Sequence, residues 1–399
     1  MSHNSVITRV CAVSFKPCWQ DDTGQWMSSG GFPLQMRAIR SLFDEMVLVV
    51  GQTSGGEART GGTPLPEGAR VVSIHQPAGE DLRRKLSVVL LLPYYVWKIG
   101  RNMRAADVVH VPLPGDIPFI AMVMALVMNK RVLARYGGSW PTNTQTTRMN
   151  RITKGLMRRF SGGRHVMLAT GAGVGDAAEG VHWIFSTALT DEELALLRPP
   201  LERGLSQPPR MIYVGRLSEE KGVATLIRAM AILARGGQSP VPHLTIAGDG
   251  SELGALERLA EELDIRDLID FRGQLARDAL SAELLRADFC VQPSLTEGFS
   301  KAWLDAMAHG LPVLASEVGA ARDVIGGDGE RGWLVPPGDE RALARALEEV
   351  VTGERDWASL RKRCRVYVEG KTLERWARQI GEYCAAQWGW CWEGGKLRQ

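Results

Sequence analysis

The sequence predicts an α/β protein made of two doubly wound, Rossmann-like domains. Short runs of apolar, often β-branched residues alternate with longer amphipathic stretches along the 399 residues. Runs that are apolar throughout are typical of parallel strands, because helices cover both faces of a parallel sheet. Two sets of such runs, one in each half of the chain, therefore favour two sheets rather than one.

Each half of the chain supplies six of these strand-like runs. In the first half they are residues 6–13, 46–50, 71–74, 108–111, 132–134 and 166–169. In the second half they are residues 211–214, 244–247, 269–271, 289–291, 313–315 and 333–335. Helical segments separate these runs, as the crossover connections between parallel strands require.

Proline pairs mark the boundary between the two halves. Pro199-Pro200 and Pro208-Pro209 flank a polar stretch without strand or helix periodicity, a composition that suits a semi-rigid linker. We therefore expect an N-terminal domain over residues 1–200 and a C-terminal domain over residues 208–370. A final helical segment, residues 371–399, is expected to cross back to the first domain.

The composition excludes several classes of protein. With 45% hydrophobic and 23% charged residues, the chain is neither disordered nor fibrous. The six cysteines are scattered and none forms a Cys-x-x-Cys pair, which favours reduced thiols in a cytoplasmic chain over a disulfide framework or a zinc site. The first 30 residues do not read as a secretory signal, and no run reaches the 18 apolar residues of a membrane span.

Basic residues are concentrated in one part of the first half. Residues 83–164 hold 15 basic and two acidic residues, although the whole chain has a net charge of only +3. From Arg83 to Arg104 the basic residues are interleaved with apolar and aromatic ones, which favours a peripheral contact with an anionic membrane surface, at the inner face of the membrane. A solvated basic face explains the charge equally well. A nucleic-acid partner is not expected, because no recognised binding motif accompanies the charge.

The strongest chemical signal follows the strand at residues 211–214. That strand ends at Gly215, Arg216 comes next, and Lys221 precedes Gly222 and a periodic helix. Open α/β sheets bind ligands at the carboxyl ends of their strands. Arginine offers a planar fork and lysine a point charge to phosphate oxygens, so the two side chains suit a diphosphate. Taken alone, they would be interpreted as surface charges.

A second segment in the same half has a similar construction. A strand is followed by a glycine turn that includes Gly298, and a helix begins near Phe299. Backbone N–H groups at Ser300 and Lys301 would be free at the helix start, where the helix dipole places about half a positive charge. The sequence therefore predicts a phosphate at this helix start.

Two carboxylates accompany that helix start. Glu297 lies just outside the helix and Asp305 two turns inside it, so both are expected on about the same face. A carboxylate can chelate a vicinal diol, which points to a ribose or a sugar ring. Each acid by itself is more often a solvated helix charge.

Together these segments resemble the donor half of a known family, the retaining GT-B-fold glycosyltransferases of group 1, which use nucleotide sugars. The close resemblance covers residues 211–342, about a third of the chain. The motifs that carry it are Gly215-Arg216 with Lys221-Gly222, Ala247-Gly248-Asp249-Gly250, Pro293-Ser294, Glu297-Gly298-Phe299 followed by Asp305, Gly310-Leu311-Pro312, and Pro337-Gly338-Asp339.

The resemblance implies that two Rossmann-like domains face each other across a cleft, with the donor on the second domain and the acceptor on the first. Arg216 and Lys221 would hold the diphosphate, and Glu297 would contact the donor sugar. Asp305 would hold the ribose hydroxyls, with a reach one methylene shorter than the glutamate of the family pattern. The other members of the implied donor site are Gly215, Gly298, Phe299, Ser300 and Lys301.

The first half resembles the family less closely. Gly30 and Gly31 look like its glycine-rich loop facing the donor phosphates, where the absence of a side chain allows close backbone approach. A plain strand-to-helix turn is the alternative. His110 matches a family strand that ends in histidine, although such a histidine is more often structural.

One departure from the family concerns the acceptor side. Many members carry a histidine after the next strand, close to the reacting sugar, and this sequence has none there. Arg135, Tyr136 and the Gly137-Gly138 amides stand at that place and are the candidates for the electrostatic role. The alternative is that the acceptor chemistry is arranged differently.

The implied activity is the transfer of a hexosyl-type sugar from a nucleotide-diphosphate sugar to a hydroxyl acceptor, with retention, in the assembly of a surface polysaccharide or glycolipid. The implied partners are the nucleotide sugar and a glycan or lipid-linked acceptor. No metal or other cofactor is expected, because cationic side chains and helix-terminal N–H groups would neutralise the leaving diphosphate. A sugar-nucleotide epimerase and a non-catalytic nucleotide-sugar-binding protein of the same fold remain as alternatives.

Overall fold

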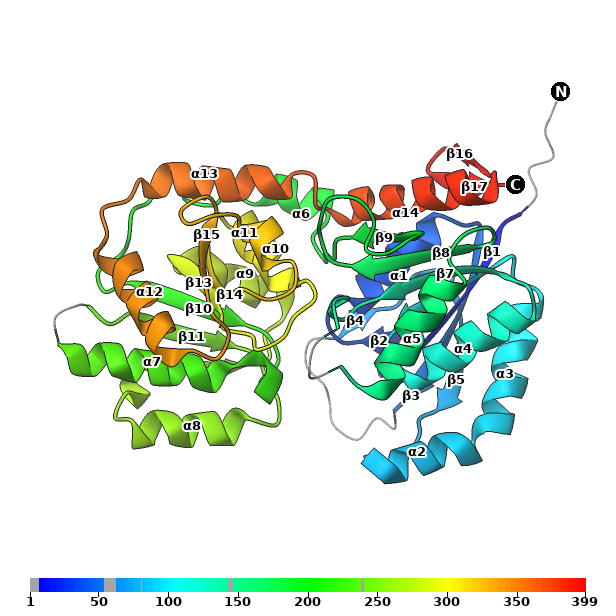
Figure 1. Cartoon of the computed structure of the whole chain (residues 1–399), viewed down its shortest axis with the longest axis horizontal. Helices are drawn as coiled ribbons and strands as arrows, with labels where there is room; N and C mark the ends of the chain where they lie inside the picture. The colour runs from blue at the N-terminus through cyan, green and yellow to red at the C-terminus, as the bar shows by residue number, and fades with distance from the viewer. Residues whose placement is uncertain (1–6, 54–61, 80, 143–145, 238–239) are drawn as a thin grey trace. The chain divides into compact units, whose positions relative to one another are not determined.

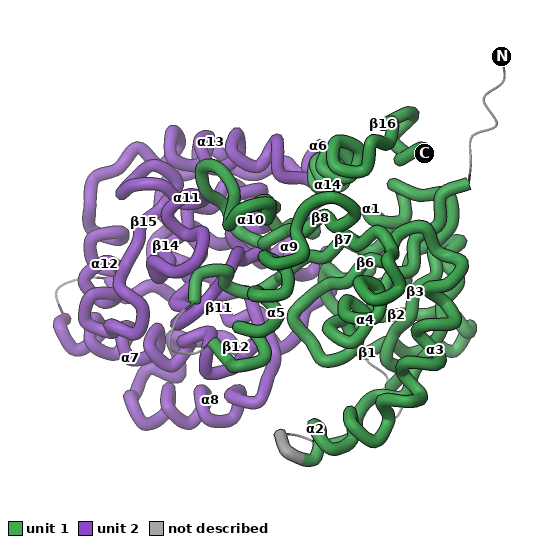
Figure 2. The backbone as a smooth tube through the Cα atoms, turned by 45° about the vertical axis from the view of Figure 1, so that its right-hand side comes forward, with its two compact units in different colours: residues 1–188, 373–399 green, residues 189–372 purple. Residues whose placement is uncertain are grey.

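The computed structural model describes residues 7–53, 62–79, 81–142, 146–237 and 240–399. It divides the chain into two compact units (Figure 2). The first unit comprises Met1–Ala188 together with Leu373–Gln399, and the second comprises Leu189–Thr372. Each is an α/β unit whose central strands are parallel, so the predicted fold class is confirmed. That the two units face each other across a cleft stays a prediction.

The boundary between the units differs from the predicted one. Helix α6 (Asp191–Leu196) lies in the second unit, although we expected residues up to 200 in the first. The helix begins with a capping box between Thr190 and Glu193, and its Leu194 is buried. The proline pairs mark a break in secondary structure, whereas polar contacts join α6 to later helices: Glu193 pairs with Arg277, and the Leu194 carbonyl accepts a hydrogen bond from Arg365.

The sheet of the first unit is parallel through most of its width. Along the sheet the parallel strands follow the order β5-β3-β1-β6-β7-β8-β9. Short strands β2 and β4 add antiparallel pairing at the end of β1. The bounds are β1 (Arg9–Gln20), β2 (Trp26–Ser28), β3 (Glu45–Gln52), β4 (Thr63–Pro64), β5 (Arg70–His75), β6 (Val108–Leu113), β7 (Arg131–Tyr136), β8 (His165–Thr170) and β9 (Val181–Ile184).

Helices cover both faces of this sheet (Figure 1). Helices α1 (Phe32–Ser41) and α14 (Leu373–Trp388) pack together on one face. Right-handed crossovers place α3 (Leu92–Arg104), α4 (Asp116–Val127) and α5 (Arg148–Arg159) on the other, with α2 (Asp81–Leu90) leading into α3. The chain ends in a hairpin of β16 (Cys391–Glu393) and β17 (Lys396–Arg398), whose two terminal cations pair with Asp44.

The second unit is built on a fully parallel sheet in the order β12-β11-β10-β13-β14-β15. The strands are β10 (Arg210–Val214), β11 (His243–Ala247), β12 (Ile269–Gly273), β13 (Phe289–Gln292), β14 (Val313–Ser316) and β15 (Gly332–Val335). Helices α7 (Val223–Gly236), α8 (Leu253–Glu262) and α12 (Glu340–Thr352) cover one face. Helices α9 (Arg277–Arg286), α10 (Lys301–Ala308), α11 (Ala321–Ile325) and α13 (Trp357–Val368) cover the other.

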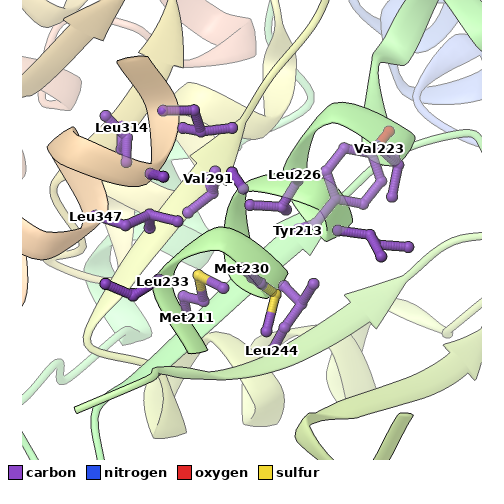
Figure 3. Packing of buried hydrophobic residues seen from close by; sticks show 14 of the residues in the cluster. Met211, Tyr213, Val223, Leu226, Met230, Leu233, Leu244, Val291, Leu314 and Leu347 are labelled. Carbon is purple, nitrogen blue, oxygen red and sulfur yellow. The ribbon is translucent and has the colours of Figure 1, made fainter. Parts of the chain in front are cut away.

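The core of the second unit lies between α7 and its sheet (Figure 3). Leu226 and Met230 point from α7 toward Met211 of β10 and Leu244 of β11, and all four side chains are buried. A buried side chain of this size stabilises the fold by about 1.5–3 kcal/mol relative to leaving it in water. This packing fixes α7, and with it the loop that joins β10 to the helix.

All twelve predicted strands are present, eleven of them within two residues of the expected bounds. The exception is β1, predicted over residues 6–13, which runs on to Gln20. The sequence missed five short ones, β2, β4, β9, β16 and β17. They contain two to four residues each, too few to show a periodic pattern.

Replacing a core side chain of α7 tests this packing. We expect Leu226→Ala to lower the free energy of unfolding of the second unit by about 2–5 kcal/mol, because the cavity left behind closes only partly. Ile232→Ala on the same helix is the control, since Ile232 is 38% exposed, and should cost under about 1 kcal/mol. Denaturant unfolding measures both, and equal losses would contradict the described packing.

Candidate functional site

The candidate site of the second unit lies where β10 and β13 run side by side. The strand order reverses between them, because the chain moves from β10 toward β12 on one side and from β13 toward β15 on the other. At such a switch point the loops after the two strands turn in opposite directions and leave a crevice at the carboxyl edge of the sheet. Arg216 and Lys221 follow β10, and Glu297 follows β13, so the predicted residues converge on this edge.

Glycines allow the loops at this edge to pack backbone against backbone. Gly222 has a φ of +65°, and a Cβ there would lie 2.2 Å from the carbonyl oxygen of Pro293. A Cβ at Gly248 would lie 1.7 Å from the carbonyl oxygen of Gly215. Neither position has room for a side chain, so these glycines hold the loops after β10, β11 and β13 in register.

The closest contact between the two predicted motifs is an ion pair. Lys221 Nζ lies 2.5 Å from Glu297 Oε2, and the side chains are only 17% and 14% exposed. The backbone N–H of Leu295 donates to the carbonyl of Glu220 at 2.9 Å, which ties the two loops together beside the pair. The structure thus joins a lysine and a glutamate that are 76 residues apart in sequence.

Arg216 is held differently from Lys221. Its side chain is 76% exposed and pairs loosely with Glu220 at 3.4 Å, so the guanidinium can turn toward a ligand. Its backbone carbonyl accepts a hydrogen bond from the Tyr213 hydroxyl at 2.8 Å. Burial, reinforced by the charge of Glu297, raises the pKa of Tyr213, so this hydroxyl stays a donor. Sequence reasoning missed Tyr213, whose polar tip on an otherwise apolar strand was the available signal.

The segment after Glu297 leads into α10, which begins at Lys301. Phe299 and Ser300 are both buried, and the Phe299 ring packs against Trp303 with 5.9 Å between ring centroids. The Gly298 carbonyl accepts a hydrogen bond from Ala320 N–H at 2.9 Å. The first turn of α10 holds no acidic residue that would oppose an anion. Phosphate binding at this helix start stays a prediction.

Asp305 is bound by a different cation from Glu297. Its carboxylate lies 3.3 Å from the Arg277 guanidinium, which also contacts Glu193 at 2.5 Å and 3.1 Å. Burial acts to lower the pKa of Arg277, but the two carboxylates outweigh it and raise this pKa. The sequence had no signal for Arg277, because its partners come from α6 and α10 and meet it only in the folded unit.

These three charged groups line a small cavity of about 220 Å³ in the second unit. His309 hydrogen bonds Ser281 at 2.8 Å through Nε2 and the Asp305 carbonyl at 2.7 Å through Nδ1. The complete lining is Leu189, Glu193, Leu196, Leu197, Arg277, Asp278, Leu280, Ser281, Leu284, Asp305 and His309. Asp305, the carboxylate that we expected to hold a ribose, is therefore oriented by Arg277.

The predicted residues of the first unit form a separate group. Gly30 has a φ of +68° in the turn before α1, and Gly31 is the residue that precedes the first turn of that helix. His110 lies on β6 and is fully buried, with Nδ1 2.9 Å from the Leu133 carbonyl. Burial, together with the charge of Arg135, lowers the pKa of His110 to about 3, although the hydrogen bond to Leu133 opposes this. His110 is therefore neutral and forms part of the interior.

Arg135 is a buried positive charge at the carboxyl end of β7. Its guanidinium donates to Gln35 at 3.0 Å and to Thr170 at 3.3 Å, and it lies over the Trp376 ring at 5.6 Å. Burial lowers the pKa of Arg135 to about 10, so the group is still charged near neutral pH. Among the residues that the structure describes, no carboxylate pairs with it. This uncompensated charge favours an anionic group in its neighbourhood.

The neighbours of Arg135 are more structural. Tyr136 is buried, its ring packs edge-on against Trp140, and burial raises its pKa to about 12. The Gly137 N–H donates to the Leu113 carbonyl at 2.6 Å, and a Cβ at Gly138 would lie 3.2 Å from the Tyr136 ring. The two glycines thus connect the ends of β6 and β7 and leave space for the ring.

Within the ranges that the structure describes, no group of three or more potential ligand side chains could hold a metal ion. No helix in those ranges combines the length and apolar content that a membrane span requires.

The ion pair at the sheet edge can be tested by a double-mutant cycle. We expect Lys221→Met to lower the free energy of unfolding by about 1–3 kcal/mol, because it leaves the mostly buried Glu297 carboxylate without its partner. Lys221→Met with Glu297→Gln should cost less than the sum of the single changes. The exposed pair Lys362–Glu202, at 2.6 Å, is the control and should contribute under about 1 kcal/mol. Strictly additive losses at the 221–297 pair would rule out the coupling.

The buried His110 predicts a specific pH dependence of stability. Its pKa is below the ordinary value in the folded protein, so only the unfolded chain takes up this proton as the pH falls below about 6.5. The contribution is therefore absent above pH 6.5 and destabilises by up to about 1.4 kcal/mol per pH unit between there and pH 3. Comparing His110→Gln with the parent by denaturant unfolding at pH 7.5 and pH 5 measures it. The free-energy loss on acidification should be smaller in the variant.

Comparisons with known proteins match part of the chain to glycosyltransferases. Residues 202–370 match the family model described as glycosyl transferases group 1. The chain is 34% identical over 189 residues to the amylovoran biosynthesis glycosyltransferase AmsK of Erwinia amylovora, an alignment that covers 46% of each protein. It is 26% identical over 384 residues to a sulfoquinovosyl transferase of Arabidopsis thaliana, covering 89% of this chain and 70% of that protein. The chain spans less than half the length of the curated relatives that it matches at 32–35% identity.

Solved structures extend the likeness to nearly the whole chain. Sucrose-phosphate synthase from Thermosynechococcus elongatus superposes with a TM-score of 0.70 at 20% identity, covering 94% of this chain and 98% of that one. HepE of Anabaena, in complex with UDP and glucose, gives 0.68 at 16% identity, covering 95% and 100%. At such identities the likeness concerns the fold, which is the GT-B pair of Rossmann-like domains. Within this GT-B fold, residues 202–370 are the part of the chain that matches the family model of glycosyl transferases group 1.

Proposed function

We propose that the protein transfers a glycosyl group from a nucleotide-diphosphate sugar to a hydroxyl acceptor, with retention at the anomeric carbon. The observation that carries the proposal is the meeting of Lys221 and Glu297 at the switch point of the second unit, beside the exposed Arg216. Cations with one carboxylate at this edge suit a diphosphate attached to a polyol. The family match over residues 202–370 supports the same assignment.

In the proposed reaction the bond between the anomeric carbon and the diphosphate oxygen breaks, and the acceptor oxygen bonds to the same face of that carbon. Arg216 and Lys221 bind the diphosphate and stabilise the charge that develops on its leaving oxygen. Glu297 orients the hydroxyls of the donor sugar. The acceptor proton passes to the leaving diphosphate oxygen, so the protein needs no separate base and no metal ion for the transfer.

The ion pair has a consequence for donor binding. Lys221 Nζ is neutralised by Glu297 before any donor binds. Donor binding must therefore separate the two side chains, so that the lysine contacts the diphosphate and the glutamate contacts the sugar hydroxyls. The lysine then turns toward phosphate oxygens, while the carboxylate accepts hydrogen bonds from the sugar. A phosphate without a sugar would leave Glu297 with the Gly298 N–H as a donor but without its lysine. We therefore expect nucleotide sugars to bind more tightly than the corresponding nucleoside diphosphates.

The acceptor and the location belong to the same proposal. Named relatives act in amylovoran biosynthesis and as a sulfoquinovosyl transferase, which supports a glycan or lipid-linked acceptor in the assembly of a surface polysaccharide or glycolipid. We place the reaction in the cytoplasm, at the inner face of the membrane. The six cysteines form no disulfide, and five of them are buried, which suits a reducing compartment.

The decisive experiment combines a thermal-shift screen of nucleotide sugars with an assay of nucleotide release on the donors that bind. We expect Arg216→Ala to lower kcat/KM by about 10²–10³-fold, because it removes a cation from the leaving group. The midpoint of thermal unfolding should not change, since the Arg216 side chain is largely exposed. Arg228→Ala, an exposed arginine on α7, is the matched control and should keep parental activity.

The product settles the remaining choices. The anomeric configuration of the new glycoside, read by NMR, reports retention or inversion. An epimer formed from the donor without an acceptor would identify an epimerase. Tight donor binding without turnover, for every acceptor tried, would support a binding protein and overturn the proposed transfer.

A further inference from the structure

The first unit exposes an unusual concentration of apolar side chains. In the described part of the chain, six of the sixteen large apolar side chains that are exposed fall within residues 86–97. They are Leu86, Val89, Leu90, Leu92, Val96 and Trp97. Trp97 is 60% exposed and Leu90 71%. A solvent-facing cluster of this kind marks an interaction site more often than a chance exposure.

Three of these side chains form an exposed row over α2 and α3: Leu86, Leu90 and Trp97. Leu86 and Leu90 stand four residues, or about one helical turn, apart on α2, and Trp97 stands on α3, beyond the turn at Leu91. Away from Trp97, α3 carries Tyr95, Ile99 and Met103, which are fully buried in the unit. Helix α3 is thus apolar on both sides, as a buried helix is, yet no described residue covers its outer side.

Basic residues continue the same row at both ends. Arg83 stands three residues before Leu86, and Arg101 and Arg104 stand four and seven residues after Trp97, so helical periodicity places them on the exposed side. Lys85 is exposed as well. These four cations form no ion pair with any residue that the structure describes, and the sequence from 83 to 104 has no acidic residue.

The other cations of the two helices are engaged within the unit. Arg84 pairs with Asp116 of α4 at 3.1 Å, and Lys98 donates to the Tyr94 hydroxyl at 3.1 Å. The unpaired cations are therefore the ones that share the exposed row with the apolar side chains. An apolar row with a tryptophan, flanked by free cations, matches the chemistry of the boundary between anionic headgroups and acyl chains.

We propose that this surface, defined by the six apolar residues together with Arg83, Lys85, Arg101 and Arg104 and here named the α2–α3 face, docks on an anionic lipid bilayer. The helices lie in the plane of the interface, the apolar row enters the acyl boundary, and the cations contact headgroup phosphates. Helices α2 and α3 lie at the margin of the first unit (Figures 1 and 2). Binding depends on negative lipid charge, because apolar contact and four cations act together.

The proposal deepens the proposed function and rests on it in one respect: a bilayer-bound enzyme takes a lipid-linked acceptor from that surface. The docking itself depends only on the first unit and needs no donor. Failure of glycosyl transfer would appear as absence of nucleotide release, whereas failure of docking would appear in vesicle binding. The two outcomes are therefore separable.

Flotation of the full chain with lipid vesicles tests the proposal. The protein should float with vesicles of 70% neutral and 30% anionic phospholipid at 0.1 M salt, bind far less to purely neutral vesicles, and dissociate as salt is raised. Leu90→Ser with Trp97→Ser should weaken the partition constant at least about tenfold. Arg101→Gln with Arg104→Gln should weaken it about fivefold for each charge removed.

Matched substitutions in the second unit provide the control. Val366→Ser removes an apolar side chain that is 63% exposed on α13, and Arg228→Gln removes an exposed cation on α7. Both should bind vesicles as the parent does. Because all substituted residues are exposed, each variant should keep the parental thermal midpoint and the parental turnover of a soluble acceptor.

Two results would overturn the proposal. One is equal flotation of the parent and Leu90→Ser with Trp97→Ser, or equal binding to neutral and anionic vesicles. The other is a dimer in solution, detected by light scattering, that this double variant dissociates while the parent binds no vesicle. The α2–α3 face would then be an interface between two copies of the chain.

Discussion

The ion pair between Lys221 and Glu297 forms because the parallel sheet places the ends of β10 and β13 next to each other. β10 and β13 are adjacent, so the loops that follow them end at one point although 76 residues separate the lysine from the glutamate. Glycines at 222 and 248 then let those loops approach until backbone meets backbone. A side chain at either position would push the loops apart. Lys221 and Glu297 would then lose their mostly buried contact, in which the attraction between the charges is stronger than in water.

The two units handle buried charge in different ways. In the second unit each cation of the site has a carboxylate: Lys221 has Glu297, and Arg277 has Asp305 and Glu193. In the first unit the Arg135 guanidinium is satisfied by neutral groups and an indole ring, and the neighbouring His110 is kept neutral by burial. A ligand of the second unit would therefore rearrange existing pairs, whereas no carboxylate in the described part of the chain pairs with Arg135 in the first unit.

Charge is also distributed unevenly over the surface. Residues 1–205 contain 23 basic and 16 acidic residues, and residues 206–399 contain 25 and 29, which gives net charges of +7 and −4. The free cations of the α2–α3 face contribute to the excess in the first half, and they share that face with apolar side chains. Because the first unit takes in residues 1–188, it carries most of this positive excess, which favours contact with an anionic surface.

The sequence by itself determined twelve of the strands and predicted the chemical type of the candidate site, because buried parallel strands and strand-ending Gly-Arg or Glu-Gly turns are local patterns. It could not reveal that Asp305 is held by Arg277 or that Tyr213 supports Arg216, since these partners come together only through strand order and helix packing. It also placed the domain boundary at the proline pairs near 200, whereas contacts of α6 with Arg277 and Arg365 join that helix to the second unit. The exposed apolar residues of α3 could not be predicted for the same reason. Periodicity shows that a helix has two apolar sides, and only the tertiary structure decides which of them is covered.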